Sequence, residues 1–359
     1  MREFRFMTTI RTKTLNEQGF SLVELLISIT LFTIVTGSIF GVMQVARTTR
    51  SVVSEKTGLN KNVRIALNLV GRDAYNAGFG YPLRNTVILT DNRIGSLLGI
   101  PNDPDTTRDT VAPIIAGDNR TLNTYNQTPN VRTDQVTFLF KDSNFNLVGG
   151  VSQPLKVNAA TTKSSGTIDE IVPLSGSNSL CDVNDLYLVT GSSGSTLGLV
   201  TGKSGTNKIE FSNGDVLGIN LAGPSGTLRQ ITVPASIQKV RMVTYFVTPD
   251  GTLTRREYAN VPPVGAAPPT NWVDAPLIYG VQNFQIEYIM DDGSVTNNPI
   301  AGPDGVAGTA DDIPTNLAAV RQIRLTVDVR SVENAPGGQP YHETQTATFS
   351  TRNLGYEAN

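Results

Sequence analysis

The sequence predicts an α+β fold in which one long, membrane-spanning N-terminal helix packs on a mostly antiparallel β-sheet domain. Three features of the 359 residues carry this prediction. Residues 25–46 hold no charged side chain, the next thirty keep an apolar period of three to four, and short alternating segments bounded by Gly, Pro, Asp and Asn fill much of the rest. With 33 Gly, 20 Pro and only 17% charged residues, the composition is typical of exported β-rich proteins.

Residues 1–19 form a basic leader that ends in Gly19 and contains no apolar run. Its charged side chains are Arg2, Arg5, Arg11 and Lys13 against Glu3 and Glu17. The uncharged run from Leu25 to Ala46 would span about 33 Å as a helix, which is enough to cross a bilayer. A secretory signal peptide has an apolar core of only about 7–15 residues, so residues 20–46 are better interpreted as a transmembrane segment.

Glu24 is the informative residue of this segment, because a carboxylate at the centre of a membrane helix costs about 2.5–3.5 kcal/mol and is usually paired or functional. If the leader were cut after Gly19, Phe20 would carry a free amine. An opposite charge within about 4 Å is worth roughly 4 kcal/mol at an effective dielectric of 20. The same helix cannot easily fold its own amine back onto Glu24, so we expect the amine to come from a neighbouring copy.

The junction Gln18-Gly19-Phe20, followed by SLVELL, resembles the type IV prepilin signature. This resemblance implies a pilin-like fold, cleavage between Gly19 and Phe20 by a prepilin peptidase, N-methylation of Phe20, and pairing of Glu24 with the first residue of an adjacent subunit. It also implies an inner-membrane helix with a periplasmic body that later joins the pilus at the cell surface. The cations on the two sides of the apolar run nearly balance, so this orientation rests on the resemblance.

Beyond Ala46 the helical period continues with an amphipathic pattern, which predicts one helix over 20–77 with an amphipathic part at 47–77. Its expected inward positions are Leu59, Val63, Ala66 or Leu67, Val70 and Ala74. The segment AGFGYP, residues 77–82, ends it. The stretch ALNLVGRDAYNAGFGY, residues 66–81, resembles PilW-type minor pilins and their relatives, the J-type pseudopilins of type II secretion.

Residues 78–134 have little periodicity and predict a loop-rich connection with a few short pieces of structure, whereas residues 135–359 predict the β-rich globular domain. Strands are expected at 135–141, 185–190, 240–247, 252–258, 284–290, 323–330 and 344–350, with a hairpin turn at 249–251. Alternation is clearest from Ile323 to Val329 and from Phe284 to Met290. The Ser-, Gly- and Thr-rich stretch 159–207 predicts variable surface loops around its one strand.

The small numbers of cysteine and histidine residues argue against an enzyme. With one cysteine, Cys181, and one histidine, His342, the chain lacks the residues for a Cys/His zinc cluster or an ordinary Cys-His nucleophile. The segment GLVTGKS, residues 198–204, misses the phosphate-binding loop pattern by one position, since Leu197 stands where Gly is needed. A net charge of −2 without a basic block argues against nucleic acid. We expect no small-molecule substrate, and Cys181 is interpreted as a half-buried apolar side chain, with an intermolecular disulfide as the second reading.

An acidic, Gly-rich segment between residues 291 and 312 predicts calcium as a candidate cofactor, because hard cations prefer several oxygen ligands. The expected ligands are Asp304, Asp311 and Asp312, with Asp292 as a contributor. The segment lacks the full EF-hand pattern, and the alternative is a solvated loop in which Asp and Gly make turns.

These observations favour a non-enzymatic structural protein. The resemblance implies a minor pilin of the PilW type that helps to initiate or cap a type IV pilus, with other minor pilins, the major pilin, the prepilin peptidase and the inner membrane as partners. A pseudopilin of type II secretion and a tip-located adhesin subunit are the alternatives. A secreted hydrolase is the rival of a different class, and it lacks a catalytic constellation.

Overall fold

The structure is a computed structural model, and it describes residues 19–81, 88–89, 93–99, 109–126, 128, 130–157, 162–163, 170–192, 194–220, 234–260, 272–301, 319–334 and 340–354. The chain divides into two compact units, residues 1–55 and residues 56–359. The first unit contains most of the long helix α1, Leu22–Asn76, and the second contains the helix's last turns and all the strands. The expected fold class is confirmed: one long apolar N-terminal helix and a mostly antiparallel β body.

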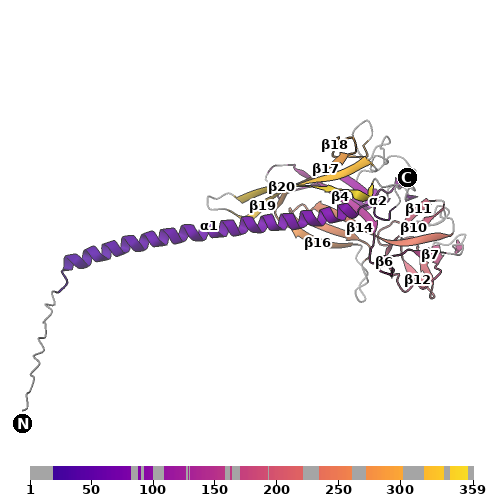
Figure 1. Cartoon of the computed structure of the whole chain (residues 1–359), viewed down its shortest axis with the longest axis horizontal. Coiled ribbons are helices and arrows are strands. Elements are labelled where there is room, and N and C mark those ends of the chain that lie inside the picture. Colours follow the sequence, from indigo (N-terminus) through magenta and orange to yellow (C-terminus); the bar gives the residue numbers. More distant parts are fainter. Residues whose placement is uncertain are drawn as a thin grey trace, which may run out of the picture. The chain divides into compact units, whose positions relative to one another are not determined.

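The elements of the body follow α1 in chain order (Figure 1). They are β1 Ile88–Leu89, α2 Arg93–Leu98, β2 Asp109–Thr110, β3 Ile114–Leu122, β4 Arg132–Lys141, β5 Leu147–Val148, β6 Val151–Ser152, β7 Leu155–Val157, β8 Thr162–Lys163, β9 Glu170–Pro173, β10 Leu186–Gly191, β11 Gly194–Leu199, β12 Gly202–Ser204, β13 Lys208–Glu210, β14 Ala235–Val247, β15 Leu253–Tyr258, β16 Trp272–Ile278, β17 Val281–Met290, β18 Val295–Thr296, β19 Val320–Asn334, β20 Pro340–Ser350 and the 3₁₀ turn η3 Arg352–Leu354.

The largest sheet is organised around β14, whose thirteen residues pair with four other strands. The first half of β14 pairs with β7 and β10, and β11 extends this side. Its second half pairs with β4 and β15, to which β3 and β16 add. The expected hairpin turn is confirmed between β14 and β15, where the N–H of Gly251 donates to the carbonyl of Thr248 at 2.9 Å.

A second sheet has the order β18-β17-β19-β20, and its buried face shows the predicted alternation. Ile323, Leu325, Val327 and Val329 are fully buried, and the residues between them are at least partly exposed. A residue's side reverses at every step along a strand, so this pattern by itself specifies which face of β19 meets the core.

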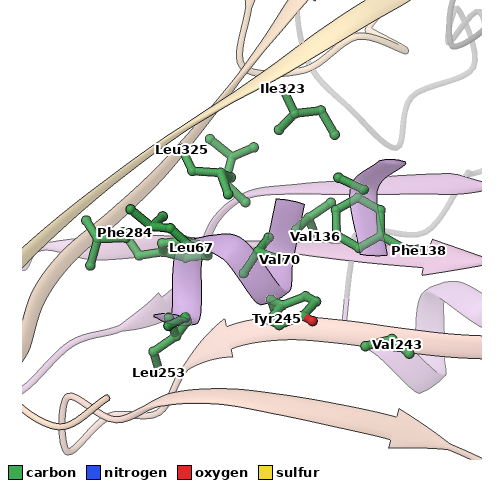
Figure 2. Close-up of a cluster of buried hydrophobic side chains, with 14 of the residues drawn as sticks. Leu67, Val70, Val136, Phe138, Val243, Tyr245, Leu253, Phe284, Ile323 and Leu325 are labelled. Carbon is green, nitrogen blue, oxygen red and sulfur yellow. The ribbon is translucent and has the colours of Figure 1, made fainter. Parts of the chain in front are cut away.

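The last turns of α1 lie between these two sheets. Figure 2 shows Leu67 and Val70 on the helix, with Ile323 and Leu325 on one side and Tyr245 and Leu253 on the other. The predicted inward positions Val63, Ala66, Leu67, Val70 and Ala74 are buried, and Leu59 is partly exposed. Gly71 permits a close approach to β20, since a Cβ there would lie 2.2 Å from the ring of Phe349. The largest of the three apolar clusters of the body is therefore built around the helix end.

Side chains of the β3–β4 region join the two sheets by capping the backbone of β17. The amide of Asn123 donates to the carbonyls of Val281 and Gln282, both at 2.9 Å. The carboxylate of Asp134 accepts from the N–H of Ile286 at 2.7 Å and from that of Asn119 at 2.8 Å. Each buried backbone group that is capped in this way avoids a desolvation cost of about 1–3 kcal/mol.

Two sequence-based expectations for the body were incomplete or wrong. The loop-rich region 78–134 contains β3, a nine-residue strand, whose alternation is obscured by a bulge between Gly117 and Thr121. The stretch 159–207 does not consist of surface loops around a single strand: it includes β8, β9, β11 and β12 besides β10. Their small residues pack because a third apolar cluster, with Phe211, Tyr187 and Cys181, fills the space beneath them. Cys181 is fully buried there, not half-buried.

Candidate processing and assembly site

The predicted processing junction stands immediately before the helix. Gly19 and Phe20 lie outside α1 and are not helical, and Phe20 is 78% exposed. A peptidase needs an accessible, non-helical backbone at the bond that it cuts, because a helical peptide bond is enclosed by its own hydrogen bonds. The geometry of Gly19 and Phe20 therefore suits the predicted cleavage.

Glu24 lies in the first turn of α1, where the local sequence Ser21-Leu22-Val23-Glu24 forms a weak capping box. The N–H of Ser21 donates to the carboxylate of Glu24, and the N–H of Val23 donates to the hydroxyl of Ser21, both at 3.4 Å. A carboxylate in the first turn also interacts favourably with the helix dipole. These contacts position the side chain, but none of them neutralises its charge.

No downstream cation can reach Glu24 along the helix. The next Lys or Arg is Arg47, which is 23 residues further and therefore about 34 Å away at 1.5 Å per residue. The pairing of Glu24 with a positive group of another molecule stays a prediction.

Four of the five side-chain hydroxyls between Leu25 and Ala46 are hydrogen-bonded to the helix itself, which lowers the cost of insertion into a membrane. Ser28, Thr30, Thr33 and Ser38 each donate to the carbonyl four residues earlier, at 2.7–2.9 Å. The most apolar 18-residue window has a mean hydropathy of 2.2, and none of it is buried within the protein. By length and composition, α1 is able to cross a membrane.

A buried ionic network, which we call the Asp73 network, holds the last turns of α1 to the large sheet. Asp73, fully buried, accepts hydrogen bonds from Tyr245 Oη at 2.7 Å and from Arg255 Nε at 3.1 Å. Arg255 in turn contacts Glu257 at 3.1 Å, and Glu257 forms a two-point pair with Arg241 at 2.6 and 2.7 Å.

The electrostatics of the Asp73 network follow from burial and charge. Burial raises the pKa of Tyr245, and the charge of Asp73 raises it further, so the phenol stays a donor. Burial alone would lower the pKa of Arg255, but the Asp73 carboxylate reverses this and the net shift is upward. Burial alone would raise the pKa of Glu257, whereas its hydrogen bonds to Arg241 and Arg255 lower it overall. Arg241, Arg255 and Glu257 are therefore charged at neutral pH.

Sequence reasoning missed the Asp73 network, although one signal was present. Asp73 falls three residues after Val70, on the stripe predicted to face inward, where a carboxylate needs a partner. The partners come from β14 and β15, more than 170 residues away in the chain, so spacing alone could not identify them.

The predicted calcium ligands are not brought together by the part of the chain that the structure describes. Asp304, Asp311 and Asp312 lie outside the described residues. Asp292 is exposed in the turn after β17, where it accepts from the N–H of Ser294 at 2.8 Å, and the Ser294 hydrogen bonds lower its pKa. Among the described residues, no three His, Cys, Asp or Glu side chains form a metal-binding group.

Comparison with known proteins identifies the N-terminal segment. Residues 14–40 match the family described as the prokaryotic N-terminal methylation motif. No curated protein and no solved structure matches the chain. The match supports a type IV pilin-like chain, either a pilin or a pseudopilin, that is processed by a prepilin peptidase and assembles with other pilins. Such chains are structural and not enzymatic.

Proposed function

We propose that the chain is a minor pilin of a type IV pilus, of the PilW type, that helps to initiate assembly or forms the pilus tip. It would enter the inner membrane through α1, be cut between Gly19 and Phe20, and be methylated on Phe20. One observation carries the proposal: Glu24, just after the methylation-motif junction, is the only charged residue between Phe20 and Ala46, and its own helix offers it no cation.

Cleavage gives the Glu24 carboxylate a partner that can drive assembly. Removal of the leader leaves an amine on Phe20 of each copy, and in an apolar setting an amine and a carboxylate at about 4 Å attract by roughly 4 kcal/mol at an effective dielectric of 20. Because Glu24 lies four residues beyond Phe20 on a helix, its favourable partner is the amine of a neighbouring subunit. The pairing fixes the axial offset between two helices that are otherwise uniformly apolar.

The size of the body supports a minor subunit over a simple fibre subunit. The unit from residue 56 to 359 has two large sheets around the helix end and additional small sheets, which is more structure than helix packing requires. The alternatives are a minor pseudopilin of a type II secretion system and a tip-located adhesin. Deleting the gene separates them, since loss of pili, loss of protein secretion, or loss of adhesion with pili intact would each indicate one role.

Processing is tested by mass spectrometry of the mature protein from its native membrane. We expect Phe20 as the first residue, with one methyl group on its amine. A mature protein that begins at Met1, or near Ala46, would contradict the proposed function.

Assembly is tested with Glu24→Ala in a strain that lacks the native copy. Without the carboxylate, insertion should become easier while assembly is impaired, because the neighbour's amine loses its partner. The protein should be found in the membrane at normal amounts but not in sheared pili. Glu55→Ala, on the same helix beyond the apolar run, is the matched control and should assemble normally. Normal piliation by Glu24→Ala would show that this carboxylate is incidental.

A further inference from the structure

The end of α1 borders a pocket of about 560 Å³ whose walls come from four separate parts of the body. The first part is the end of α1 with the turn after it, which contributes Arg72, Tyr75 and Phe79. The other three are β4 with Phe140 and Lys141, β14 with Arg241, and the 3₁₀ turn with Arg352. This volume lies within the range of about 300–1,000 Å³ typical of ligand-binding sites.

The pocket is positively charged at its opening. Four cationic side chains line it, Arg72, Lys141, Arg241 and Arg352, against two carboxylates, Asp73 and Asp142. Both carboxylates are occupied within the chain: Asp73 by Tyr245 and Arg255, and Asp142 by the N–H of Asn144 at 3.0 Å. Arg72 contacts Asp73 at 3.1 Å while 60% of its side chain remains exposed. Arg241 is itself paired with Glu257 at 2.6 Å, so the positive charge that faces solvent at the opening is carried by Arg72 and Lys141.

Apolar side chains surround this opening. Tyr75 and Phe79 are each nearly half exposed although they are large aromatic residues. The β5–β6 hairpin begins at the pocket wall, since Lys141 Nζ donates to the carbonyl of Ser152 at 2.6 Å and Ser152 Oγ donates to that of Asp142 at 3.0 Å. Leu147, Val148 and Val151 on this hairpin are all more than half exposed.

The hairpin is built to present these side chains. Its two-residue turn, Gly149-Gly150, has φ values of 61° and 80°, which suit a tight turn that glycine adopts without strain. The buried ring of Phe145 and the bond from Ser152 Oγ to the carbonyl of Phe145, at 2.7 Å, hold its base. Three apolar side chains that an ordered hairpin exposes to water have an unfavourable hydration free energy, which is removed when another surface covers them.

From this juxtaposition we propose that the pocket and the β5–β6 hairpin together form a docking surface for an acidic segment of a different pilin-like subunit. Exposed aromatic and apolar groups beside arginines are the composition of a protein interface, whereas a small anion would use only the cations. A carboxylate of the partner would enter the pocket and pair with Arg72, while its apolar side chains cover Leu147, Val148 and Val151. The identity of the partner class rests on the proposed function.

The surface is tested in cells that carry the full-length chain. Val148 is replaced by the photo-crosslinking residue benzoylphenylalanine, and the same replacement of Val295, an exposed apolar residue on β18, is the control site. After illumination, the crosslinked species and the crosslinked peptide are identified by mass spectrometry. We expect position 148, and not position 295, to crosslink an acidic segment of another protein that begins with a processed N-terminal methylation motif.

Charge variants test the role of the pocket. Arg72→Gln should reduce the crosslink from position 148 about fivefold or more, a typical effect of an interface arginine, while Arg132→Gln, at an exposed arginine on β4, should leave it unchanged. Val151→Asn should also reduce it without altering the amount of protein in the membrane. A reduction by Arg72→Gln with unaltered resistance to protease excludes misfolding as the cause.

Three results would overturn the proposal. Crosslinking to lipid would indicate a membrane-facing surface, crosslinking to a second copy of this chain would indicate a self-interface, and no crosslink from a protein that is processed at Phe20 and assembled would show that the surface is unused. A chain that is not processed at Phe20 would instead refute the proposed function, so the two failures are distinguishable.

Discussion

Asp73→Asn should loosen the attachment of α1 to the large sheet. The substitution keeps the shape of the side chain and an oxygen that can accept from Tyr245, but it removes the charge that balances Arg255. The side chain of Arg255 is 12% exposed, and its second partner is Glu257. The guanidinium therefore stays buried with one carboxylate, which it shares with Arg241.

The size of the loss in the free energy of unfolding follows from these contacts. Removing one partner of a buried ion pair costs about 3–5 kcal/mol when the other charge is left alone. A hydrogen bond to a charged group contributes about 1.5–3 kcal/mol, and the remaining Glu257 contact keeps the loss near this lower range. We expect Asp73→Asn to lower the free energy of unfolding by about 2–3 kcal/mol, or the melting temperature by about 4–6 °C.

The assay is urea denaturation of the full chain in detergent micelles. Trp272, the only tryptophan, pairs with Tyr258 of β15 and reports on the sheet that contains Arg255 by its fluorescence. Asp291→Asn is the control, because Asp291 and Arg321 lie 3.5 Å apart with both side chains about half exposed. Such surface pairs contribute about 0–1 kcal/mol. Equal, small losses for both variants would refute a stabilising role of the Asp73 network, as would additive effects of Asp73→Asn and Arg255→Gln.

Two further predictions concern acidity and calcium. Burial raises the pKa of Asp134 from 3.8 to about 7, assisted by the nearby Asp118, although hydrogen bonds from the N–H groups of Asn119 and Ile286 act the other way. The neutral form is therefore favoured in the folded state: its contribution is complete below pH 3.8 and is lost as the pH rises through 7. The free energy of unfolding from urea titrations should therefore fall from pH 5 to pH 8 by at most about 2.7 kcal/mol, and Asp134→Asn should flatten this dependence. For calcium, we propose that Asp304, Asp311 and Asp312 bind the ion, so that a hundredfold excess of calcium over Kd stabilises the protein by about 2.7 kcal/mol. Asp304→Ala should abolish this gain and leave the melting temperature in chelator unchanged. Identical melting curves of the unsubstituted protein in calcium and in chelator would show that the segment only forms turns.

The features predictable from sequence are those in which the signal is local. The uncharged run to Ala46 specifies a membrane-length helix because hydropathy and length are properties of consecutive residues. The alternation in β19 and β17 specifies their buried faces because side chains reverse at each residue. The junction at Gly19 and Phe20, with Glu24 following, is likewise a short motif, and the methylation-motif match covers it.

The features that sequence reasoning missed depend on contacts between distant residues. Strand β3 was obscured because its bulge interrupts the alternation that identifies a strand. The strands within 159–207 contain Gly residues, whose weak strand preference is overridden by tertiary contacts: β11 pairs with β10, which pairs with β14, and Gly198 of β11 lies against the ring of Phe211. Asp118 and Asp134 lie within one hairpin, but their proximity requires the register of β3 and β4.

By itself, the sequence determined that this protein has a membrane-length N-terminal helix with one carboxylate in its apolar part, a methylation motif at the start of that helix, and a β-rich body. Only the tertiary structure decided that the helix end lies between two sheets, that Asp73 is held by Tyr245 and Arg255, and that a cationic pocket borders an exposed apolar hairpin. The physical reason is the separation along the chain over which each kind of signal acts. Periodicity and motif spacing act within a few turns or strands, whereas a buried charge is stable only where partners 172 and 182 residues away are brought to it by the packed sheets.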